Sequence, residues 1–412
     1  TDRTCIIPIM TNATLGTCTY TVQAGDTSAD LNVNTVAATT GSVLDIAGNT
    51  ANLTPTSNLA DTSAIVIDTT SPDAFIVGGV FARGGTEVAS YWNFTNTSVD
   101  VVVPVANDTS LVGGTLQLQA EADGTFENVG PAFPITLGSL GTSIFYSISA
   151  AELEAISGFS EGDVITFTAI ITDLAGNAAI GTQSATVLTV DQTAPTVNAG
   201  TDKEVNTLAA QDATTSDLGS GLATHQWSKI SGLGIITFSA ATSVDTNISA
   251  SVDDTYIIRL TVTDMAGNSN SDDITFVWDT TPPTVALSSS TPDPTNGFIF
   301  VVAQFSETVT DFGAIDIAVG NGTVDSFVAV DGDTYQFNVN PADGQSVAVT
   351  IDVPMATSVD AAGNANIASN QITRTSDTVA PAVSSITTTD ANLDGAVDTA
   401  TIVFTEAMKD ST

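Results

Sequence analysis

The stretch DMAGN, residues Asp264–Asn268, has three counterparts in the chain that differ from it only in the second residue. The counterparts are Asp45–Asn49 (DIAGN), Asp173–Asn177 (DLAGN) and Asp360–Asn364 (DAAGN). Each copy follows a stretch in which apolar and polar residues alternate, as they do in a β-strand. Glycine supplies a positive φ, asparagine tolerates one, and aspartate can bond its own backbone across a turn. The pattern therefore predicts a tight hairpin turn in each of four repeats.

An acidic linker that ends in proline follows each copy. The linkers are DTTSP from Asp68, DQTAP from Asp191, DTTPP from Asp279 and DTVAP from Asp377. Their aspartates lie 123, 88 and 98 residues apart (68 to 191, 191 to 279, 279 to 377), which is the size of a small domain. Because composition alone predicts fewer than one such compound match, the sequence indicates a tandem array.

The linkers predict where the domains begin and end. We expect the C-terminal half of a domain at residues 1–67, complete domains at 73–190, 196–278 and 284–376, and the start of a truncated domain at 382–412. Neither end of the chain could close a sandwich alone. We therefore expect either a window from a longer polypeptide or ends that neighbouring copies complete.

Composition favours an all-β fold. Apolar residues make up 42% of the chain and charged residues, mostly aspartate, only 13%, while threonine, serine, asparagine and glycine fill most of the remainder. Threonine with valine and isoleucine favours strands, and the others favour turns. The only convincing helical stretch is SAAELEAISGF, where Ser149 is a credible N-cap with Glu152 three residues on, and we expect it to cross between two sheets.

The charge balance excludes several partners. Seven lysines and arginines stand against 46 aspartates and glutamates, which gives a net charge of −39. Proteins that bind nucleic acid or anionic membranes need clustered basic residues, which this chain lacks. No apolar run is long enough to span a bilayer. Such acidity would drive domains apart unless divalent cations neutralise it, and carboxylates suit Ca²⁺. Acidity alone would also keep a secreted protein soluble.

Catalysis has little support in the sequence, so we expect no enzyme. The single histidine, His225, lies near Trp227, which is predicted to be a core residue. A catalytic serine or cysteine elsewhere in the chain would therefore have no histidine to act as its base. The two cysteines, Cys5 and Cys18, allow either a local disulfide or two free thiols.

The strongest ligand motif lies near the C-terminal end. Its oxygen-bearing residues follow the spacing D-x-N-x-D-G-x-x-D, which matches the start of a calcium loop with glycine at its sixth position. They are Asp390, Asn392, Asp394 and Asp398. Position 12 is Thr401 rather than a glutamate, so the sequence favours a partial, β-embedded calcium loop over the alternative, an Asx-rich turn that needs no ion.

The repeats resemble the bacterial Ig-like domains of large extracellular adhesins. The segments QFSETVTDF, VGNGTV, DTYQFNV and DAAGNAN of residues 284–376 carry the resemblance, and VFTEAM repeats its opening near the end of the chain. The third domain, from NAGTDKEV through THQWSKISG to DTYIIRLTVTDMAGN, is more similar to a PKD-type domain. In such sandwiches a tryptophan such as Trp227 is buried and a tyrosine such as Tyr256 sits at a sheet corner. The resemblance implies tandem immunoglobulin-like β-sandwiches in an extended array, secretion to the cell surface, and frequent calcium between domains.

By this resemblance, acidic groups at each domain end converge on a cation. The turn aspartates are Asp45, Asp173, Asp264 and Asp360, the linker aspartates are Asp68, Asp191, Asp279 and Asp377, and two domains add Glu307 and Glu406. The alternative is that the turn motif serves backbone geometry only.

We therefore expect a structural role, a section of an adhesin stalk stiffened by Ca²⁺. The second hypothesis is a subunit that assembles into a surface layer, sheath or filament. The expected partners are neighbouring domains or copies of the same protein, together with a host, biofilm or surface ligand bound outside this window. A glycan- or protein-binding module is the weakest hypothesis, since aromatic residues make up only 6% of the chain.

Overall fold

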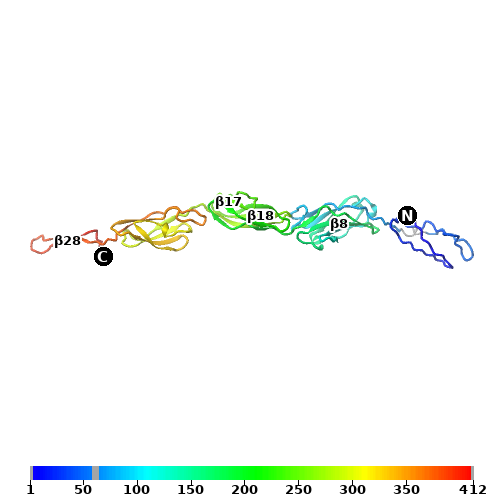
Figure 1. The fold of residues 1–412 in the computed structure, drawn as a ribbon, viewed down its shortest axis with the longest axis horizontal. Coiled ribbons are helices and arrows are strands. Elements are labelled where there is room, and N and C mark those ends of the chain that lie inside the picture. Colours follow the sequence, from blue (N-terminus) through cyan, green and yellow to red (C-terminus); the bar gives the residue numbers. More distant parts are fainter. Residues whose placement is uncertain (1–2, 58–64, 410–412) are drawn as a thin grey trace. The chain divides into compact units, whose positions relative to one another are not determined.

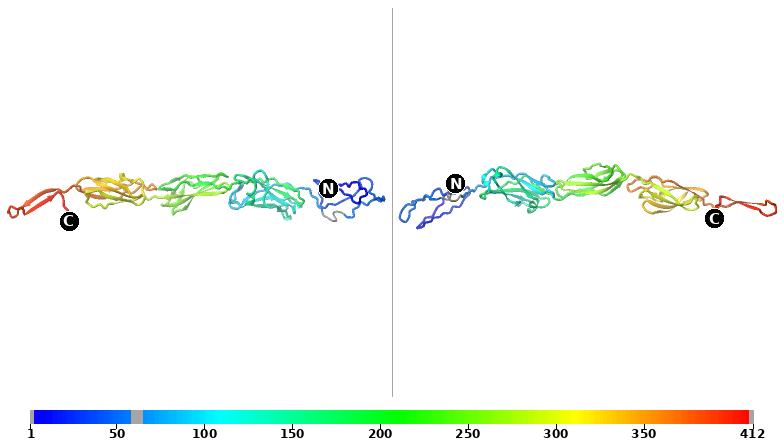
Figure 2. Two further views of the ribbon diagram at one scale, coloured as in Figure 1. Left: turned by 90° about the horizontal axis from the view of Figure 1, so that it is seen from below. Right: turned by 180° about the vertical axis from the view of Figure 1, so that it is seen from behind.

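The computed structural model describes residues 3–57 and 65–409 and consists almost entirely of strands and loops (Figures 1 and 2). The all-β prediction is confirmed. None of the described helices has the length and apolar character needed to cross a bilayer. Parts of the predictions for the first and last domains fall on residues 1–2, 58–64 and 410–412, which lie outside the described residues.

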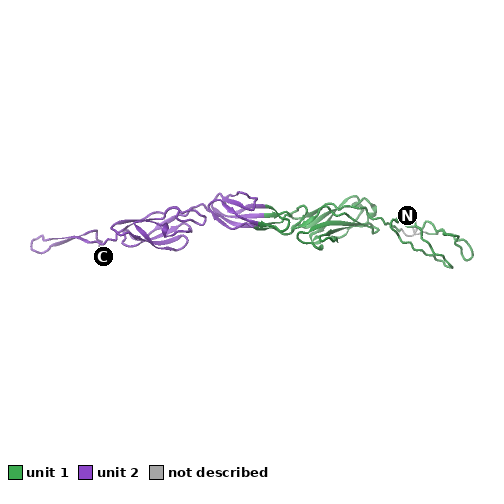
Figure 3. Cartoon of the chain, in the orientation of Figure 1, with its two compact units in different colours: residues 1–197, 215–224, 262–270 green, residues 198–214, 225–261, 271–412 purple. Residues whose placement is uncertain are grey.

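The chain divides into two compact units (Figure 3). Unit 1 comprises Thr1–Val197, Thr215–Thr224 and Val262–Asn270, and unit 2 comprises Asn198–Thr214, His225–Thr261 and Ser271–Thr412. The predicted domain at 196–278 contributes to both, so the strands of each unit are described in turn.

The first 57 residues form no strand in their described part. Isolated bridges join Ser28 to Ile67 and Leu44 to Thr50, and a turn forms at Gly25, whose φ is 88°. No regular strand forms on either side of this turn, where most side chains are exposed and no second sheet of the described residues covers them. Cys5 and Cys18 form a disulfide with their Cα atoms 5.9 Å apart.

Residues 73–190 of unit 1 fold into two sheets around one core. The first has the order β1-β3-β7 and the second β2-β10-β8-β4-β5, with β6 on β4 and β9 on β8. The strands are β1 (Val80–Arg83), β2 (Tyr91–Trp92), β3 (Ser98–Pro104), β4 (Thr115–Glu121), β5 (Glu127–Asn128), β6 (Phe133–Pro134), β7 (Ser143–Ser149), β8 (Val164–Thr172), β9 (Ala178–Ile180) and β10 (Leu188–Val190). Alternate residues of β3 and β4 are buried, so each sheet turns one face to the core, where Trp92 and Phe167 are fully buried.

The expected helical stretch is present as α1 (Ala150–Leu153). Ser149 and Glu152 form the capping box, in which the Ser149 amide donates to the Glu152 carboxylate at 2.8 Å. Because α1 lies between β7 of one sheet and β8 of the other, the predicted crossing is also confirmed. Two short 3-10 helices, Thr109–Leu111 and Leu137–Ser139, complete this region.

The strands of residues 196–278 form a four-stranded sheet, β12-β19-β18-β15, a three-stranded sheet, β13-β17-β16, and the pair β11-β14. They are β11 (Thr196–Asn198), β12 (Lys203–Val205), β13 (Ala209–Gln211), β14 (Thr214–Ser216), β15 (Leu222–Ser231), β16 (Ile236–Phe238), β17 (Thr246–Ala250), β18 (Asp254–Asp264) and β19 (Ser269–Trp278). Trp227 on β15 is only 1% exposed, and the hydroxyl of the buried Tyr256 donates to the Val252 carbonyl oxygen at 2.7 Å. Both side chains therefore have the core and corner roles expected of this fold class.

Residues 284–376 of unit 2 form a second two-sheet sandwich. Its sheets have the orders β20-β21-β24-β23 and β22-β25-β26. The strands are β20 (Val285–Ser288), β21 (Ile299–Phe305), β22 (Ala318–Gly320), β23 (Gly322–Ala329), β24 (Thr334–Pro341), β25 (Val347–Asp352) and β26 (Ile372–Ser376), with a 3-10 helix at Ala314–Asp316. Phe305, Phe312 and Tyr335 meet edge to face in its core. Beyond it, β27 (Val383–Thr389) and β28 (Thr399–Phe404) form a hairpin with exposed faces.

Candidate metal centres at the domain joints

All four Asp-x-Ala-Gly-Asn turns have the same internal geometry. The backbone N–H of the aspartate donates to the backbone carbonyl oxygen of the asparagine at 2.9–3.1 Å. The backbone N–H of the asparagine donates to Oδ1 of the aspartate at 2.8 Å. Asparagine Nδ2 donates to aspartate Oδ2 at 2.8–2.9 Å. The glycine φ lies between 85° and 95°, a region that favours glycine. The predicted turn chemistry is confirmed.

Three of these turns also hold a linker. Asparagine Nδ2 donates to the carbonyl oxygen of the linker aspartate from Asn177 to Asp68 at 3.0 Å, from Asn268 to Asp191 at 2.9 Å, and from Asn364 to Asp279 at 2.9 Å. In each case the linker is the one that precedes the turn's own domain, although the following linker is much closer in sequence. The motif is therefore more than a local turn, because its asparagine fixes the start of the domain to its far hairpin.

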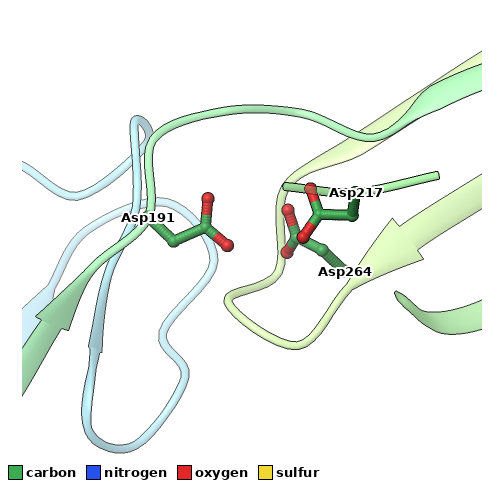
Figure 4. Close-up of side chains that lie close together, drawn as sticks. All are labelled: Asp191, Asp217 and Asp264. Atoms are coloured by element: carbon green, nitrogen blue, oxygen red, sulfur yellow. The ribbon is translucent and has the colours of Figure 1, made fainter. Parts of the chain in front are cut away.

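The joint between the second and third domains, which lies within unit 1, brings three carboxylates together (Figure 4). Asp191 from the linker, Asp264 from the turn and Asp217 after β14 place one oxygen each within 4.8 Å of one another. Asp191 and Asp264 are only 1% and 2% exposed. The Ser220 amide donates to Asp191 at 2.7 Å, and the Gly221 amide donates to Asp217 at 2.6 Å.

Two oxygens at this joint are buried and lack a hydrogen-bond partner among the described residues. They are Oδ1 of Asp217 and Oδ1 of Asn268, the second on a side chain that is 0% exposed. A buried acceptor without a partner costs about 1–3 kcal/mol. Each of these two oxygens is therefore available to accept a bond from a group other than the described residues.

The ionisation of the two buried aspartates differs. Burial raises the pKa of Asp264 above its ordinary value, and the nearby Asp191 charge adds to this, against the lowering effect of the Asn268 hydrogen bonds. Burial also opposes ionisation of Asp191, but hydrogen bonds from the Ser220 hydroxyl and amide lower its pKa overall. The Asp191 charge therefore adds to the larger effect of burial on Asp264.

A second group of the same construction lies within unit 2. Asp279 from the linker, Asp360 from the turn and Glu307 after β21 place one oxygen each within 4.8 Å of one another. Burial raises the pKa of Glu307, and the charges of Asp360, Asp279 and Glu204 raise it further. No described residue donates a hydrogen bond to the Glu307 carboxylate that would offset this repulsion.

The raised pKa of Glu307 predicts a pH effect. Because the folded state holds this proton more tightly than the unfolded state does, the contribution of Glu307 to stability is complete below its ordinary value of 4.5 and is lost as pH rises through the folded-state pKa. In chelator, the wild type should therefore lose stability relative to Glu307→Gln as pH rises from 4.5 to the folded-state pKa of Glu307. Denaturant unfolding at a series of pH values measures the difference. A difference that stays constant with pH would contradict the prediction, and Asp212→Asn, at an exposed residue outside both groups, serves as the control.

Asp217 was not among the residues predicted from the sequence. Asp217 comes after a serine at the end of β14, and Glu307 comes after a serine just beyond β21. This shared pair of a serine and an acid is the sequence signal that could have identified Asp217 as a candidate ligand. Of the other predicted ligands, Asp45, Asp68, Asp173, Asp377 and Glu406 join no group of three carboxylates among the described residues. Glu406 accepts a hydrogen bond from Gln345 at 3.4 Å, and Asp377 accepts one from the Val379 amide at 3.2 Å.

The predicted loop at residues 390–398 forms an exposed network of its own. Asp390 accepts bonds from the amides of Asp394 and Gly395, and Asp398 accepts bonds from the amides of Ala391 and Asn392. These are Asx-turn contacts, and no three carboxylates of this described segment come within 4.8 Å. Calcium binding by Asp390, Asn392, Asp394 and Asp398 stays a prediction.

Comparison with known families identifies two segments. Residues 279–375 match the model of the bacterial Ig-like domain, and residues 199–277 match a model of the PKD domain. No curated protein matches the sequence significantly.

Several solved structures are similar to the chain. One is from a 1.5-MDa bacterial ice-binding adhesin, with 16% identity over 68% of this chain and 90% of that chain and a TM-score of 0.26. A tetra-tandem repeat in the extending region of a large adhesion protein has 16% identity over 77% of this chain and 78% of that chain, with a TM-score of 0.28. The bacterial integrin-binding protein invasin has 14% identity over 75% of this chain and 61% of that chain, with a TM-score of 0.29.

Proposed function

We propose that this chain, which carries a bacterial Ig-like domain and a PKD-like domain, is a structural repeat segment of a secreted cell-surface protein. Its sandwiches act as spacers, and calcium at the joints makes successive domains rigid with respect to each other. The observation that carries the proposal is the repeated joint, in which a linker aspartate, a turn aspartate and a third acid come within 4.8 Å at two places. A spacer needs no catalytic group.

Electrostatics supports a cation at these joints. Three carboxylates this close repel one another in a partly buried setting, where screening by water is reduced. Ca²⁺ binds six to eight oxygens and accepts carboxylates and carbonyls in flexible geometry. Asp191, Asp217 and Asp264 would supply three ligands at the first joint, and Asp279, Glu307 and Asp360 would supply three at the second. With the ion absent, each joint holds an uncompensated negative charge within a protein whose net charge is already −39.

A calcium titration of the whole chain tests the proposal. At a free concentration about a hundredfold above the dissociation constant, one bound ion should stabilise its domain by about 2.7 kcal/mol. Scanning calorimetry in calcium and in chelator should show the corresponding rise in melting temperature. Magnesium should act more weakly, because it demands stricter octahedral geometry. Identical thermograms in calcium and in chelator would rule out the calcium joint.

A matched pair of variants assigns the effect to one joint. Asp217→Asn removes a charge while leaving an oxygen that can accept the amide bonds from Gly219 and Gly221. Asp212→Asn removes the same charge from an exposed position in the same domain. The first should lose the calcium response of the third domain and the second should keep it. Equal responses in the two variants would place the ion elsewhere.

A further inference from the structure

Strand β7 forms one edge of the three-stranded sheet β1-β3-β7 in residues 73–190. It runs over seven residues, Ser143–Ser149, and pairs with β3 in one unbroken register. In an edge strand, the backbone N–H and C=O groups that point away from the neighbouring strand can pair with a further strand. The backbone of β7 can therefore receive another strand, provided that the protein itself does not protect this edge.

The register identifies the residues of β7 that present these groups. The backbone N–H of Ala150, just beyond β7, donates to the Thr97 carbonyl oxygen, just before β3, at 2.9 Å. Bonded and non-bonded pairs alternate along an antiparallel ladder. By the register with β3, the backbone groups of Ser143, Phe145 and Ser147 therefore point away from that strand. No described residue forms a hydrogen bond with these groups.

Strand β7 lacks the features with which natural proteins protect such an edge. Those features are a charged side chain, a proline or a β-bulge. Every other edge strand of five or more residues between residues 73 and 376 has one of them, namely Lys229 on β15, Arg374 on β26, and a bulge between Asp325 and Val328 on β23. The sequence of β7, SIFYSIS, has none, and its Phe145 side chain is 65% exposed.

The sheet that contains β7 is neutral, although the protein has a net charge of −39. Its three strands carry one acid, Asp100, and one base, Arg83, and these two form an ion pair in which Nε and Oδ2 are 3.0 Å apart. A strongly charged partner would gain little attraction from this sheet. Two copies of the chain, in contrast, can bring their β7 strands together without repulsion between the contacting residues.

The outer face of β7 is complementary to itself. The side chains that point away from the core are those of Ser143, Phe145 and Ser147, so the pattern reads the same in both directions about Phe145. If two such strands pair antiparallel across a two-fold axis at Phe145, serine faces serine and phenylalanine faces phenylalanine. Aromatic side chains directly opposite each other stabilise an antiparallel pair. The occupant that fits this edge best is therefore a second β7.

We propose that β7 is a self-association site, at which two copies of the chain pair antiparallel and join their three-stranded sheets into one continuous sheet. Phe145 of each copy exchanges both backbone bonds with its counterpart, and Ser143 of one copy does so with Ser147 of the other. Both copies use the same surface, so the contact closes as a dimer. The inference goes beyond the spacer role and uses none of the joint carboxylates.

Sedimentation velocity of the full chain tests the association. A single strand pair buries less surface than a standard protein interface does, so the dimer should be weak and should increase with concentration. In chelator with about 0.15 M salt, which screens charges more than about 8 Å apart, we expect a reversible equilibrium between monomer and dimer. A chain that stays monomeric at every concentration, or that grows beyond the dimer, would overturn the inference.

Substitutions on β7 test whether this edge makes the contact. Ser147→Pro removes an N–H that points away from β3, a position at which edge strands tolerate proline, and the variant should lose the dimer. Phe145→Lys should lose it too, because two lysines would face each other across the axis. Val328→Lys makes a similar change at a 54% exposed residue of the bulged edge strand β23, and it should dimerise as the wild type does. Dimers that persist in both β7 variants would place the contact elsewhere.

Introduced cysteines test the register. Cys5 and Cys18 are bonded to each other, so a new thiol reports on its own position. Directly opposed residues of a bonded pair have Cα atoms about 5.5 Å apart, which a disulfide can span. Phe145→Cys should therefore form a covalent dimer under mild oxidation. Ser143→Cys and Ser147→Cys should each stay monomeric alone and cross-link when mixed.

The outcomes separate this inference from the calcium proposal. Cross-linking of Ser143→Cys with itself, or a mixture with Ser147→Cys that does not cross-link, would contradict pairing about Phe145. Melting curves like that of the wild type show that the variants are folded. The calcium-dependent melting of a dilute monomer would stand in either case, since it depends on joints within one chain.

Discussion

Replacing Asn268 with alanine should destabilise the third domain by about 2–4 kcal/mol, since it breaks several buried bonds at once. Asn268 is 0% exposed, and its Nδ2 donates to both the Asp191 carbonyl oxygen and the Asp264 carboxylate. After truncation both oxygens stay buried without these donors. Among the described residues, no other donor bonds to the Asp191 carbonyl oxygen.

Hydrogen exchange of the full chain measures this loss domain by domain. Amides of β18 and β19 that open only with the third domain should exchange faster in Asn268→Ala, while those of β21 and β24 should not change. Asn49→Ala is the matched control, because the same turn is exposed there and holds no linker. Its effect should be far smaller. Equal losses in the two variants would mean that the bond to the linker contributes nothing.

The sequence was a good guide to whatever depends on local chemistry. Alternation predicted the strands that precede the turns, such as β8 and β18, and turn residues predicted the bonding of all four Asp-x-Ala-Gly-Asn copies. Ser149 and Glu152 predicted the one helix start correctly, because a capping box involves only neighbouring residues. Local chemistry alone is not enough around Gly25, where the turn forms but no strand does, because no second sheet of the described residues buries one face.

The contacts that build the joints are not local, and that is why sequence alone could not assign them. Asn268 and Asp191 are 77 residues apart, and Asn177 and Asp68 are 109 apart. No neighbouring residue shows that a turn returns to the linker before its domain. The sequence nominated Asp279, Glu307 and Asp360, and the fold brings them together. It missed Asp217, because the segment around it has no alternating pattern to indicate a strand end.

Glu307→Gln should change the sign of its effect with calcium. In chelator, the variant should be more stable than the wild type at neutral pH, because the wild type carries a carboxylate whose pKa is raised by burial and by Asp360, Asp279 and Glu204. In calcium, the wild type gains a ligand that the neutral amide supplies poorly. It should then become the more stable protein, by up to about 2.7 kcal/mol at a hundredfold excess over the dissociation constant.

This reversal separates a calcium joint from ordinary acidic repulsion. If the three carboxylates only repel one another, Glu307→Gln stabilises the protein in both buffers, and the two melting curves keep their order. If Glu307 were instead a hydrogen-bonded structural group, the variant would be the less stable protein in both. Only an ion shared by Asp279, Glu307 and Asp360 makes the order of melting temperatures depend on calcium, so calorimetry of two proteins in two buffers decides among the three cases.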